Sequence, residues 1–325
     1  MISDIKMENW KTIATNLSRL ELPLQRLDAK QQQLAAMRPI PPLVLERIRE
    51  ALALEWTYNS NAIEGNTLTL PETRAVIEEG ITVRGKSLRE HLEAINHHEA
   101  IELVTEMARP GVRLTEQMVL QLHALVLQKI DRAWAGRYRT MGVRISGAGF
   151  TPPDPLKVPE LMQDLLEWLY LPTTALHPLL LATAFHHRFV WIHPFADGNG
   201  RTVRLAGNLL LLAQGYPPAI VLKQDRRKYY NALHQADNGN LYPLCLLLLQ
   251  ACERSLDIYL SNLRGNAGDY KPIGNLVEEE AVPYGEEYIG LLARRGKIDA
   301  YKEGKIWYTT KAAIDAYRAG RKRMR

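Results

Sequence analysis

The chain has 325 residues, 46% of them hydrophobic and 24% charged, and this composition excludes disordered, collagen-like and low-complexity proteins. Its length predicts two or three domains. The longest apolar runs, such as residues 244–249, are far shorter than the ~20 residues of a membrane span, and no signal-like leader follows Met1. We therefore expect a cytoplasmic protein with no membrane partner, in which Cys245 and Cys252 are buried and reduced.

Positive charge is concentrated at the C-terminal end of the chain. Residues 286–325 contain eleven Lys and Arg against five Asp and Glu, a net charge of +6, whereas the whole chain carries +5. The other 285 residues therefore sum to about −1. A compact basic segment of this kind indicates a nucleic-acid partner, and the alternative is a solubilising tail.

In chain order, the spacing of apolar residues predicts a mainly α fold. Residues 1–40 are expected to be helical, and a proline-rich break separates them from the next helix. Between the later helices, alternating residues and a Gly-rich turn predict a small β-hairpin over 142–155. Gly, Asn and Pro predict a linker over 264–275. The further predicted helices are 43–64, 69–79, 88–107, 115–128, 158–170, 176–192, 202–214, 225–235 and 241–263.

One loop between two apolar helices combines the residue types that handle phosphates. Gly198 and Gly200 flank Asn199 where the second helix begins, and bare backbone N–H groups at a helix N-terminus bind anions. Arg201 and Arg204 are three residues apart and share one helix face. Two cations at this end of a helix oppose its dipole unless a polyanion such as a triphosphate offsets the repulsion.

Two further residues of the loop indicate chemistry at that phosphate. Asp197 offers a hard oxygen ligand, which suits Mg²⁺ bound jointly by one carboxylate and a nucleotide. His193 can accept a proton from an incoming hydroxyl at neutral pH. Together these residues predict phosphoryl or nucleotidyl transfer, in which alignment and charge neutralisation supply most of the catalysis.

The stretch from His193 to Arg204 resembles the signature of the Fic (fido) family, H-P-F-x-[DE]-G-N-G-R-x-x-R, and matches it at every position. The resemblance extends to Gly136-Arg-Tyr-Arg139 and to Tyr229-Tyr230, and it covers about residues 43–263. It implies a Fic-type helical bundle with a small β-hairpin flap. It also implies a protein adenylyltransferase that uses ATP and Mg²⁺ (or Mn²⁺) to transfer AMP to a Ser, Thr or Tyr hydroxyl of a target protein or of itself.

The resemblance assigns roles to particular positions. It implies that His193 is the base and that Asp197 holds the metal. Tyr229 and Tyr230 would line the nucleoside pocket. The phosphate-binding set would be Gly198, Asn199, Gly200, Arg201, Thr202, Val203 and Arg204. The flap on which an extended target segment docks by strand addition would comprise Val143, Ile145, Ser146, Gly147, Ala148 and Gly149.

A second motif resembles the inhibitory motif of the same family, [ST]-x-x-x-[ED]-[GN], and comprises Ser60, Glu64, Gly65 and Asn66. Glu64 falls in the last turn of the predicted helix over about 43–64, where the helix dipole disfavours an acid. The resemblance implies that Glu64 pairs with Arg204 and occupies the space that a γ-phosphate needs. In some relatives this glutamate supports AMP removal, so a de-AMPylase remains an alternative.

The basic end of the chain looks like a winged helix-turn-helix. A helix ends at Gly296, a two-stranded wing turns at Glu303-Gly304, Trp307 anchors the wing, and a helix follows over 310–319. If DNA is bound, its phosphates would be contacted by Arg294, Arg295, Lys297 and Lys305. A protein partner remains an equal alternative for residues 286–325.

The expected domains are a helical region over 1–110 that carries the inhibitory helix, a catalytic core over 111–263, and a linker with the basic module over 264–325. Two further alternatives have different functions: a Doc-like protein kinase and a nucleotide-sensing, DNA-binding regulator. Gly200 favours AMP transfer over the kinase, in which lysine typically replaces this glycine, and His193 argues against a pure sensor. Relatives often form homodimers, so a homodimer is expected.

Overall fold

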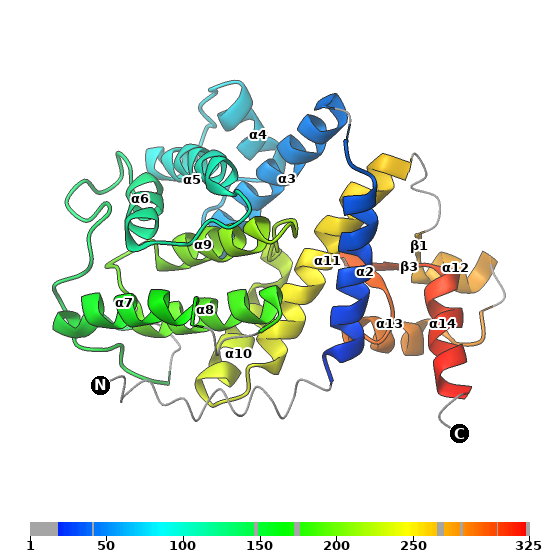
Figure 1. The fold of residues 1–325 in the computed structure, drawn as a ribbon. Helices are drawn as coiled ribbons and strands as arrows, with labels where there is room; N and C mark the ends of the chain where they lie inside the picture. The colour runs from blue at the N-terminus through cyan, green and yellow to red at the C-terminus, as the bar shows by residue number, and fades with distance from the viewer. Residues whose placement is uncertain are drawn as a thin grey trace.

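The computed structural model describes residues 19–40, 42–145, 149–171, 176–264, 270–279, 282–303 and 305–322. In the N-terminal half of the described chain all the regular elements are helices, joined by loops (Figure 1). Its helices are α2 (Glu21–Ala36), α3 (Pro42–Ile63), α4 (Leu70–Glu78), α5 (Leu88–Met107) and α6 (Glu116–Val126). They lie close to the predicted positions, and the helix expected over 1–40 is described only from residue 19.

Capping residues explain where several of these helices begin. Thr69 and Glu72 form a capping box at α4, and Ser87 and Glu90 form another at α5, so that each helix start satisfies two backbone N–H groups. The Thr115 hydroxyl accepts the N–H of Met118 at α6. These local signals are the reason why the sequence located the helix ends to within a residue or two.

The central helices form the middle of the molecule. They are α7 (Val158–Trp168), α8 (Pro178–Ile192), α9 (Asn199–Ala213), α10 (Arg226–Asp237) and α11 (Tyr242–Arg264), with short 3₁₀ helices η1 (Pro155–Lys157) and η2 (Lys223–Asp225). α8 packs on α9, and α5 contacts α3, α6 and α9. α9 begins at Asn199, three residues earlier than predicted, because Gly198 adopts a left-handed backbone (φ 78°) and serves as its N-cap.

One hydrophobic cluster runs through the helical part of the chain, from Leu20 in front of α2 to Leu260 in α11. It crosses the predicted domain boundary between residues 110 and 111 without a break, so the N-terminal helices and the central helices share one core. Cys245 and Cys252 are buried free thiols within it, as predicted. None of the helices in the described part of the chain combines the length and apolar character that a membrane crossing requires.

The predicted β-hairpin over 142–155 is wrong for the part of this segment that the structure describes. Residues 142–145 and 149–154 form no strand, and Ser146, Gly147 and Ala148 lie outside the described residues. Pro152 and Pro153 cannot donate to a strand ladder, and a lone two-stranded hairpin is only marginally stable. The Arg139 guanidinium donates to the carbonyl groups of Met141 and Pro153, which ties both ends of this segment to the core.

The C-terminal module has a hydrophobic core of its own. It contains β1 (Lys271–Pro272), α12 (Ile273–Glu279), α13 (Glu286–Arg294), β2 (Ala300–Glu303), β3 (Ile306–Thr309) and α14 (Lys311–Lys322). The sheet has the antiparallel order β1-β3-β2. Residues 270–275 therefore belong to the module, and the linker prediction is wrong there, because Pro272 is tolerated on an edge strand.

The C-terminal module packs against α2 and α11 (Figure 1). Lys30 of α2 donates to Asp257 of α11 at 2.6 Å and also contacts Asp299, which precedes β2. Arg26 pairs with Glu253 of α11 and donates to the carbonyl of Gly296 at 3.3 Å. Buried ion pairs thus join the two hydrophobic cores.

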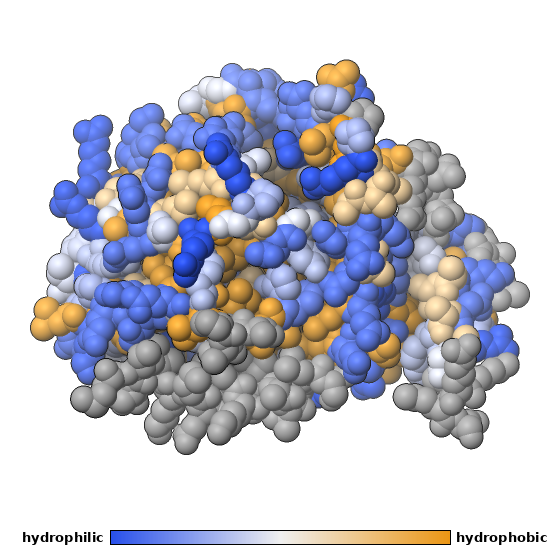
Figure 2. All heavy atoms as spheres, in the orientation of Figure 1, coloured by the Kyte–Doolittle hydropathy of each residue, from blue (hydrophilic) through white to orange (hydrophobic). Residues whose placement is uncertain are grey.

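The face in Figure 2 is hollowed between α2, α3 and α5, and apolar residues are exposed there. A cavity of about 650 Å³ lies at this place. Its walls include Leu52, Ala53 and Trp56 of α3, Tyr216 after α9, and Tyr259 of α11. The His193–Arg204 loop does not line this cavity.

Candidate active site

His193 occupies the C-terminal end of α8. This helix is mostly apolar and nine of its 15 residues are buried, so it fixes the histidine on a rigid support. His193 has a left-handed backbone (φ 50°) and its N–H donates to the Phe189 carbonyl at 2.9 Å. Its Nδ1 lies 3.4 Å from the Val190 carbonyl, which favours the tautomer with the proton on Nδ1 and a free lone pair on Nε2. Burial lowers the pKa of His193 to about 4, so the ring is neutral at pH 7.

The loop between His193 and α9 is held by hydrogen bonds to its main chain. The Asn199 side chain accepts from the Phe195 N–H at 2.9 Å and donates to the Phe195 carbonyl at 2.8 Å. Both ends of the Asn199 amide are therefore used to shape the loop. A phosphate contact from this position would have to come from its backbone N–H.

The first intrahelical hydrogen bond of α9 runs from the Thr202 N–H to the Gly198 carbonyl. The N–H groups of Asn199, Gly200 and Arg201 precede it and form the helix N-terminus, where the dipole favours an anion. The side chains of Thr202 and Val203 are fully buried. Any nucleotide contact at these two predicted positions is thus limited to the backbone.

Arg201 and Arg204 are only 3% and 4% exposed, which is unusual for a charged side chain. Arg201 Nη1 lies 3.2 Å from Glu93 of α5. Arg201 Nε and Arg204 Nη1 are buried and have no hydrogen-bond partner in the described part of the chain. Buried donors that are left unsatisfied are costly, and an anionic ligand at this place would satisfy them.

Glu64 and Arg204 form the contact that the family resemblance implied. Arg204 Nη2 donates to Glu64 Oε1 at 2.7 Å and to the Ser60 carbonyl at 2.9 Å, while Arg204 Nε donates to the Ser60 hydroxyl at 2.9 Å. A Cβ atom on Gly200 would lie 2.1 Å from Glu64 Oε1. Only glycine at position 200 therefore lets the carboxylate approach the first turn of α9.

The residues after Glu64 fix the end of α3. Gly65 has φ +105°, a conformation that favours glycine. The Asn66 amide donates to the Glu90 carbonyl and to Glu93, each at 3.0 Å. Arg226 donates to the Ile63 carbonyl at 2.7 Å. The end of α3 is thus attached to α5 and α10, and Glu64 is held at a fixed position.

Asp197 directly precedes the N-cap of α9, and its Oδ1 lies 3.5 Å from Arg201 Nη2. Its carboxylate is 50% exposed and accepts from Arg89 and from the Gly198 N–H, each at 2.6 Å. Burial raises the pKa of Asp197, but Arg201, the Gly198 N–H and Arg89 outweigh this effect, so the pKa lies below its ordinary value. The carboxylate is therefore ionised and reachable from solvent, as a ligand for a hard cation must be.

The two tyrosines at the predicted nucleoside pocket have different surroundings. Tyr229 is 2% exposed, its hydroxyl lies 2.7 Å from His186 Nε2, and its ring centroid is 6.0 Å from the Arg204 guanidinium. Tyr230 is 37% exposed and packs under the Arg226 guanidinium at 5.0 Å. Tyr230 thus offers an accessible ring face, whereas Tyr229 supports Arg204 from within.

The flap residues that the structure describes, Val143, Ile145 and Gly149, are half-buried or exposed. Arg139 is 1% exposed and donates to the His193 carbonyl at 2.8 Å, which links the start of the flap to the loop. One buried arginine, Arg139, therefore holds the start of the flap next to His193. The family resemblance includes Arg139 but assigns it no role.

His123 of α6 is a site residue that the sequence did not reveal. Its Nε2 lies 3.0 Å from the Asp197 carbonyl and its Nδ1 accepts the Gly136 N–H at 3.1 Å. The ring stacks on Phe195 with 3.6 Å between centroids. Burial lowers its pKa to about 4. The available signal was its position on the apolar face of a predicted helix, which cannot be told from an ordinary core histidine.

Proteins of known family resemble this chain. Residues 113–211 match the Fic/DOC family. Over 241 residues, or 74% of this chain, the sequence is 36% identical to the protein adenylyltransferase Fic of Nematostella vectensis, of which 56% is covered. The chain spans about half the length of the curated relatives it matches.

Two solved structures share the fold. Fic-1 (aa134–508) from C. elegans has a TM-score of 0.68 at 31% identity, with 78% of this chain and 75% of that chain covered. A Fic domain containing signaling protein from Bacteroides thetaiotaomicron VPI-5482 has a TM-score of 0.68 at 30% identity, with 75% and 98% covered. The mainly α, Fic-type fold is thereby confirmed, and this chain belongs to the Fic/DOC family.

Proposed function

We propose that this chain is a protein adenylyltransferase that transfers AMP from ATP to a Ser, Thr or Tyr hydroxyl, in a target protein or in itself. The observation that carries the proposal is the meeting of a neutral His193 with two buried arginines at the start of α9. The name of the relatives at 36–37% identity agrees with it.

In this reaction the hydroxyl oxygen attacks the α-phosphorus of ATP, the bond to the β-phosphate oxygen breaks, and pyrophosphate leaves. His193 Nε2 takes the hydroxyl proton, since Nδ1 faces the Val190 carbonyl. Arg201, Arg204 and the first N–H groups of α9 would neutralise the phosphate charge. Tyr230 would contribute the accessible ring face of the nucleoside pocket.

Asp197 would hold Mg²⁺ or Mn²⁺ together with phosphate oxygens. Its ionised, half-exposed carboxylate fits a hard cation. The described residues contain no cluster of three or more His, Cys, Asp or Glu that could hold an ion without the nucleotide. A bound ion would add positive charge beside the leaving pyrophosphate.

We further propose that Glu64 inhibits this activity. Its carboxylate takes up Arg204 Nη2 and reaches the first turn of α9 at Gly200, where a phosphate would otherwise lie. Like charges repel at such distances, so the γ-phosphate and Glu64 cannot share Arg204. Glu64→Gly should therefore raise AMP transfer at least about tenfold, since removing ~1.4 kcal/mol of competition already changes occupancy tenfold.

The test compares wild type, Glu64→Gly and His193→Ala, each incubated in cell lysate with ATP labelled at the α or the γ phosphate. Glu50→Gly is the matched control, because Glu50 is an exposed glutamate of the same helix and lies several turns before the residues that contact Arg204. We expect label from the α phosphate only, stronger in Glu64→Gly, absent in His193→Ala and unchanged in Glu50→Gly. Label from the γ phosphate that is absent in His193→Ala would instead establish the Doc-like kinase.

Removal of AMP from a modified protein is a second candidate function. Arg204 engages Oε1 of Glu64, and Oε2 makes no hydrogen bond within the described residues, so this oxygen could orient an attacking water. The test incubates pre-adenylylated target with each variant. Loss of AMP release in Glu64→Gly would support this function, whereas unchanged release would exclude Glu64 from it.

The basic module and the oligomeric state also belong to this proposal. We propose that residues 286–325 bind DNA or a protein partner, and that the catalytic core over 111–263 acts within a homodimer. Sedimentation of the full chain with and without DNA distinguishes these possibilities. DNA binding without transfer of label from either phosphate would favour the nucleotide-sensing regulator.

A further inference from the structure

The cavity of about 650 Å³ on the hollowed face of Figure 2 has the size of a small-molecule site. Pockets for small ligands commonly measure about 300–1,000 Å³ and combine an apolar lining with a few polar groups. Most of the residues that line this cavity are apolar, and they include Leu34 of α2, Leu52, Ala53 and Trp56 of α3, Ile101 of α5 and Tyr216 after α9. An apolar hollow of this size that opens on the surface indicates a binding site.

Two arginines and a tyrosine hydroxyl meet at one end of the cavity. Arg38 follows α2, Arg49 belongs to α3 and Tyr259 belongs to α11, so three separate elements contribute to this end. Burial raises the pKa of Tyr259, whereas the charge of Arg49, a side-chain hydrogen bond with Arg49 and the charge of Arg38 oppose this rise. Both guanidinium groups therefore lie close to the same phenol.

These two guanidinium groups are available to an anion. Arg38 and Arg49 are exposed, and neither forms an ion pair within the described residues. A guanidinium presents five N–H donors in a fixed fork, which a carboxylate can accept in a bidentate geometry. The O–H of Tyr259 can donate to the same anion while its oxygen accepts from Arg49.

The acids of the lining belong to other parts of the cavity wall. Glu102 and Glu106 are on α5, and Glu102 lies 3.9 Å from His98 of the same helix. Glu50 follows Arg49 directly, but neighbouring positions of a helix point about 100° apart. None of these three acids is among the described groups that shift the pKa of Tyr259. A ligand would therefore direct its negative charge to the α11 end of the cavity and not to α5.

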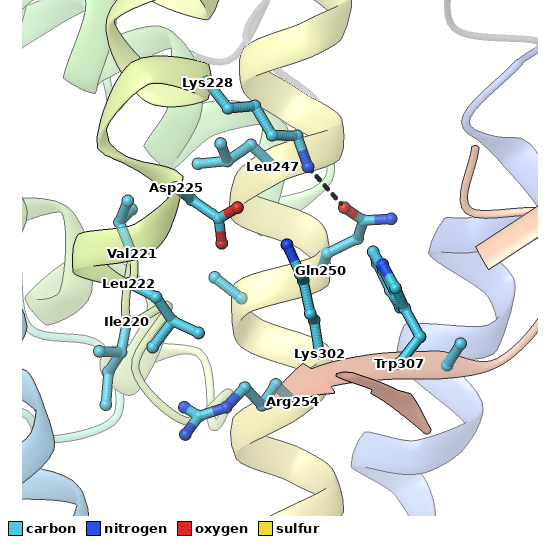
Figure 3. A pocket seen from close by; sticks show the side chains of 12 residues that line it. Ile220, Val221, Leu222, Asp225, Lys228, Leu247, Gln250, Arg254, Lys302 and Trp307 are labelled. Carbon is cyan, nitrogen blue, oxygen red and sulfur yellow. Dashed lines mark hydrogen bonds between the residues drawn. The ribbon is translucent and has the colours of Figure 1, made fainter. Parts of the chain in front are cut away.

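A smaller cavity, between the helical core and the C-terminal module, illustrates the opposite case (Figure 3). Its volume is about 40 Å³. Asp225 lies beside Lys228 and Lys302, while Arg254 pairs with Glu55 and points away from both lysines. The cations there are already balanced by acids of the protein, whereas the two arginines of the large cavity are not.

We propose that the large cavity binds a free monocarboxylic acid with an apolar chain or ring, whose carboxylate lies between Arg38, Arg49 and Tyr259. The apolar part of the ligand would lie along α3, against the side chains that give this wall its hydrophobic character. None of the residues 193–204 lines the cavity, so the site is separate from the proposed AMP-transfer site.

The position of the cavity gives such a ligand a wider effect. Its walls include residues of α3 and the end of α9 at Leu212 and Ala213. The same two helices are joined by the Glu64–Arg204 pair. An occupant would therefore contact both helices of the proposed inhibitory contact. Because only the folded chain forms the cavity, binding should also stabilise the whole chain.

The test titrates decanoate, below the concentration at which it forms micelles, into the full chain by isothermal titration calorimetry. Wild type should bind one decanoate, and Arg49→Gln should bind it at least about tenfold more weakly, since hydrogen bonds to a charged group are lost. Arg38→Gln is the second head-group variant and should act in the same direction. Arg47 is exposed on the same helix and outside the cavity, so Arg47→Gln should bind like wild type.

Two further comparisons test the apolar wall and the ligand class. Ala53→Trp places a large side chain in the cavity and should weaken decanoate binding at least about tenfold. Decanol and decyltrimethylammonium keep the chain and change the head group, and each should bind wild type at least about tenfold more weakly than decanoate. Equal or tighter binding of decyltrimethylammonium would assign the head group to Glu102 and Glu106 and overturn the proposal.

Three other results would also overturn it. Wild type that binds no decanoate lacks the site. Equal weakening in Arg47→Gln and Arg49→Gln would indicate a diffuse effect of surface charge. Unchanged binding in Arg49→Gln and Ala53→Trp together would locate decanoate elsewhere. His193→Ala should bind decanoate like wild type, so that failure of the proposed AMP transfer and failure of this site remain separate results.

Discussion

The two basic regions of the molecule differ in where their charges lie. At the α8–α9 loop, Arg201 and Arg204 are almost fully buried and each faces a glutamate from another part of the chain. In the C-terminal module, Arg294, Arg295 and Lys305 are exposed. Burial makes the first pair strongly dependent on its partners, whereas solvent and salt screen the second group. Substitutions of the buried basic residues should therefore change stability or activity more than substitutions of the exposed ones.

The largest effect on stability is expected at Lys30, whose buried charge joins the helical core to the C-terminal module. In Lys30→Met, the carboxylates of Glu253, Asp257 and Asp299 lose their shared cation. Breaking a buried pair from one side costs about 3–5 kcal/mol because the remaining charges stay uncompensated. Urea unfolding of the full chain measures the loss. Lys311→Met, at an exposed position of α14, is the control and should change the stability by less than about 0.5 kcal/mol. Equal effects of the two substitutions would contradict the distinction between buried and exposed charge.

Acid should weaken the helical core. Burial lowers the pKa of His123 and His193 to about 4 and that of His186 to about 3. The unfolded chain binds these protons near pH ~6.5, so the unfolded state holds more protons between about pH 6.5 and 4 and stability falls as the pH falls. At pH 5 each histidine would cost about 2 kcal/mol.

Urea midpoints at pH 7 and pH 5 measure this dependence. Burial also lowers the pKa of His97 well below its ordinary value, so four rings contribute and His123→Gln should reduce the dependence by about one quarter. All nine histidines precede residue 235, so the C-terminal module contributes none of the effect. A stability that is equal at pH 7 and pH 5 would show that these rings are protonated without loss in the folded chain.

A smaller effect is expected from Gly200→Ala. The new Cβ would lie 2.1 Å from Glu64 Oε1, so the carboxylate must move away from Arg204, at a cost of about 1–3 kcal/mol for crowding a packed site. In the Glu64→Gly background the obstacle is absent, and the same substitution should cost much less. A double-mutant cycle of unfolding free energies measures the coupling. Strict additivity would mean that Glu64 does not occupy this place in solution.

The smallest effects are expected from the exposed basic residues of the C-terminal module. If the module binds DNA, replacing Arg294, Arg295 or Lys305 singly by Gln should lower the slope of log K against log salt by about 0.9 for each phosphate that the variant no longer neutralises. The fold should be unaffected, because these side chains are exposed. Fluorescence anisotropy at several salt concentrations makes the measurement. Salt-independent binding would point to a protein partner instead.

The helices could be predicted because their signals are local. Thr69 with Glu72 and Ser87 with Glu90 form the capping boxes of α4 and α5, and apolar residues at helical spacing mark α3. The prediction of a hairpin over 142–155 is wrong for the described part of that segment, because alternating residues describe an extended chain and do not specify a partner strand. In the structure that segment is bound by Arg139. The linker prediction failed at residues 270–275 for a related reason, since β1 exists only through its pairing with β3.

For the candidate site, the sequence by itself determined which groups are present: a histidine, a helix start rich in glycine, two arginines, a carboxylate and a second motif with Glu64. Only the tertiary structure decided their states. It holds His193 neutral by burial and brings Glu64 to Arg204 across 140 positions of the chain. It also places His123 and Glu93 beside the loop, where they contact Asp197 and Arg201. Residue types and short spacings are written in the sequence, whereas desolvation and long-range charge pairing arise only when the helices pack.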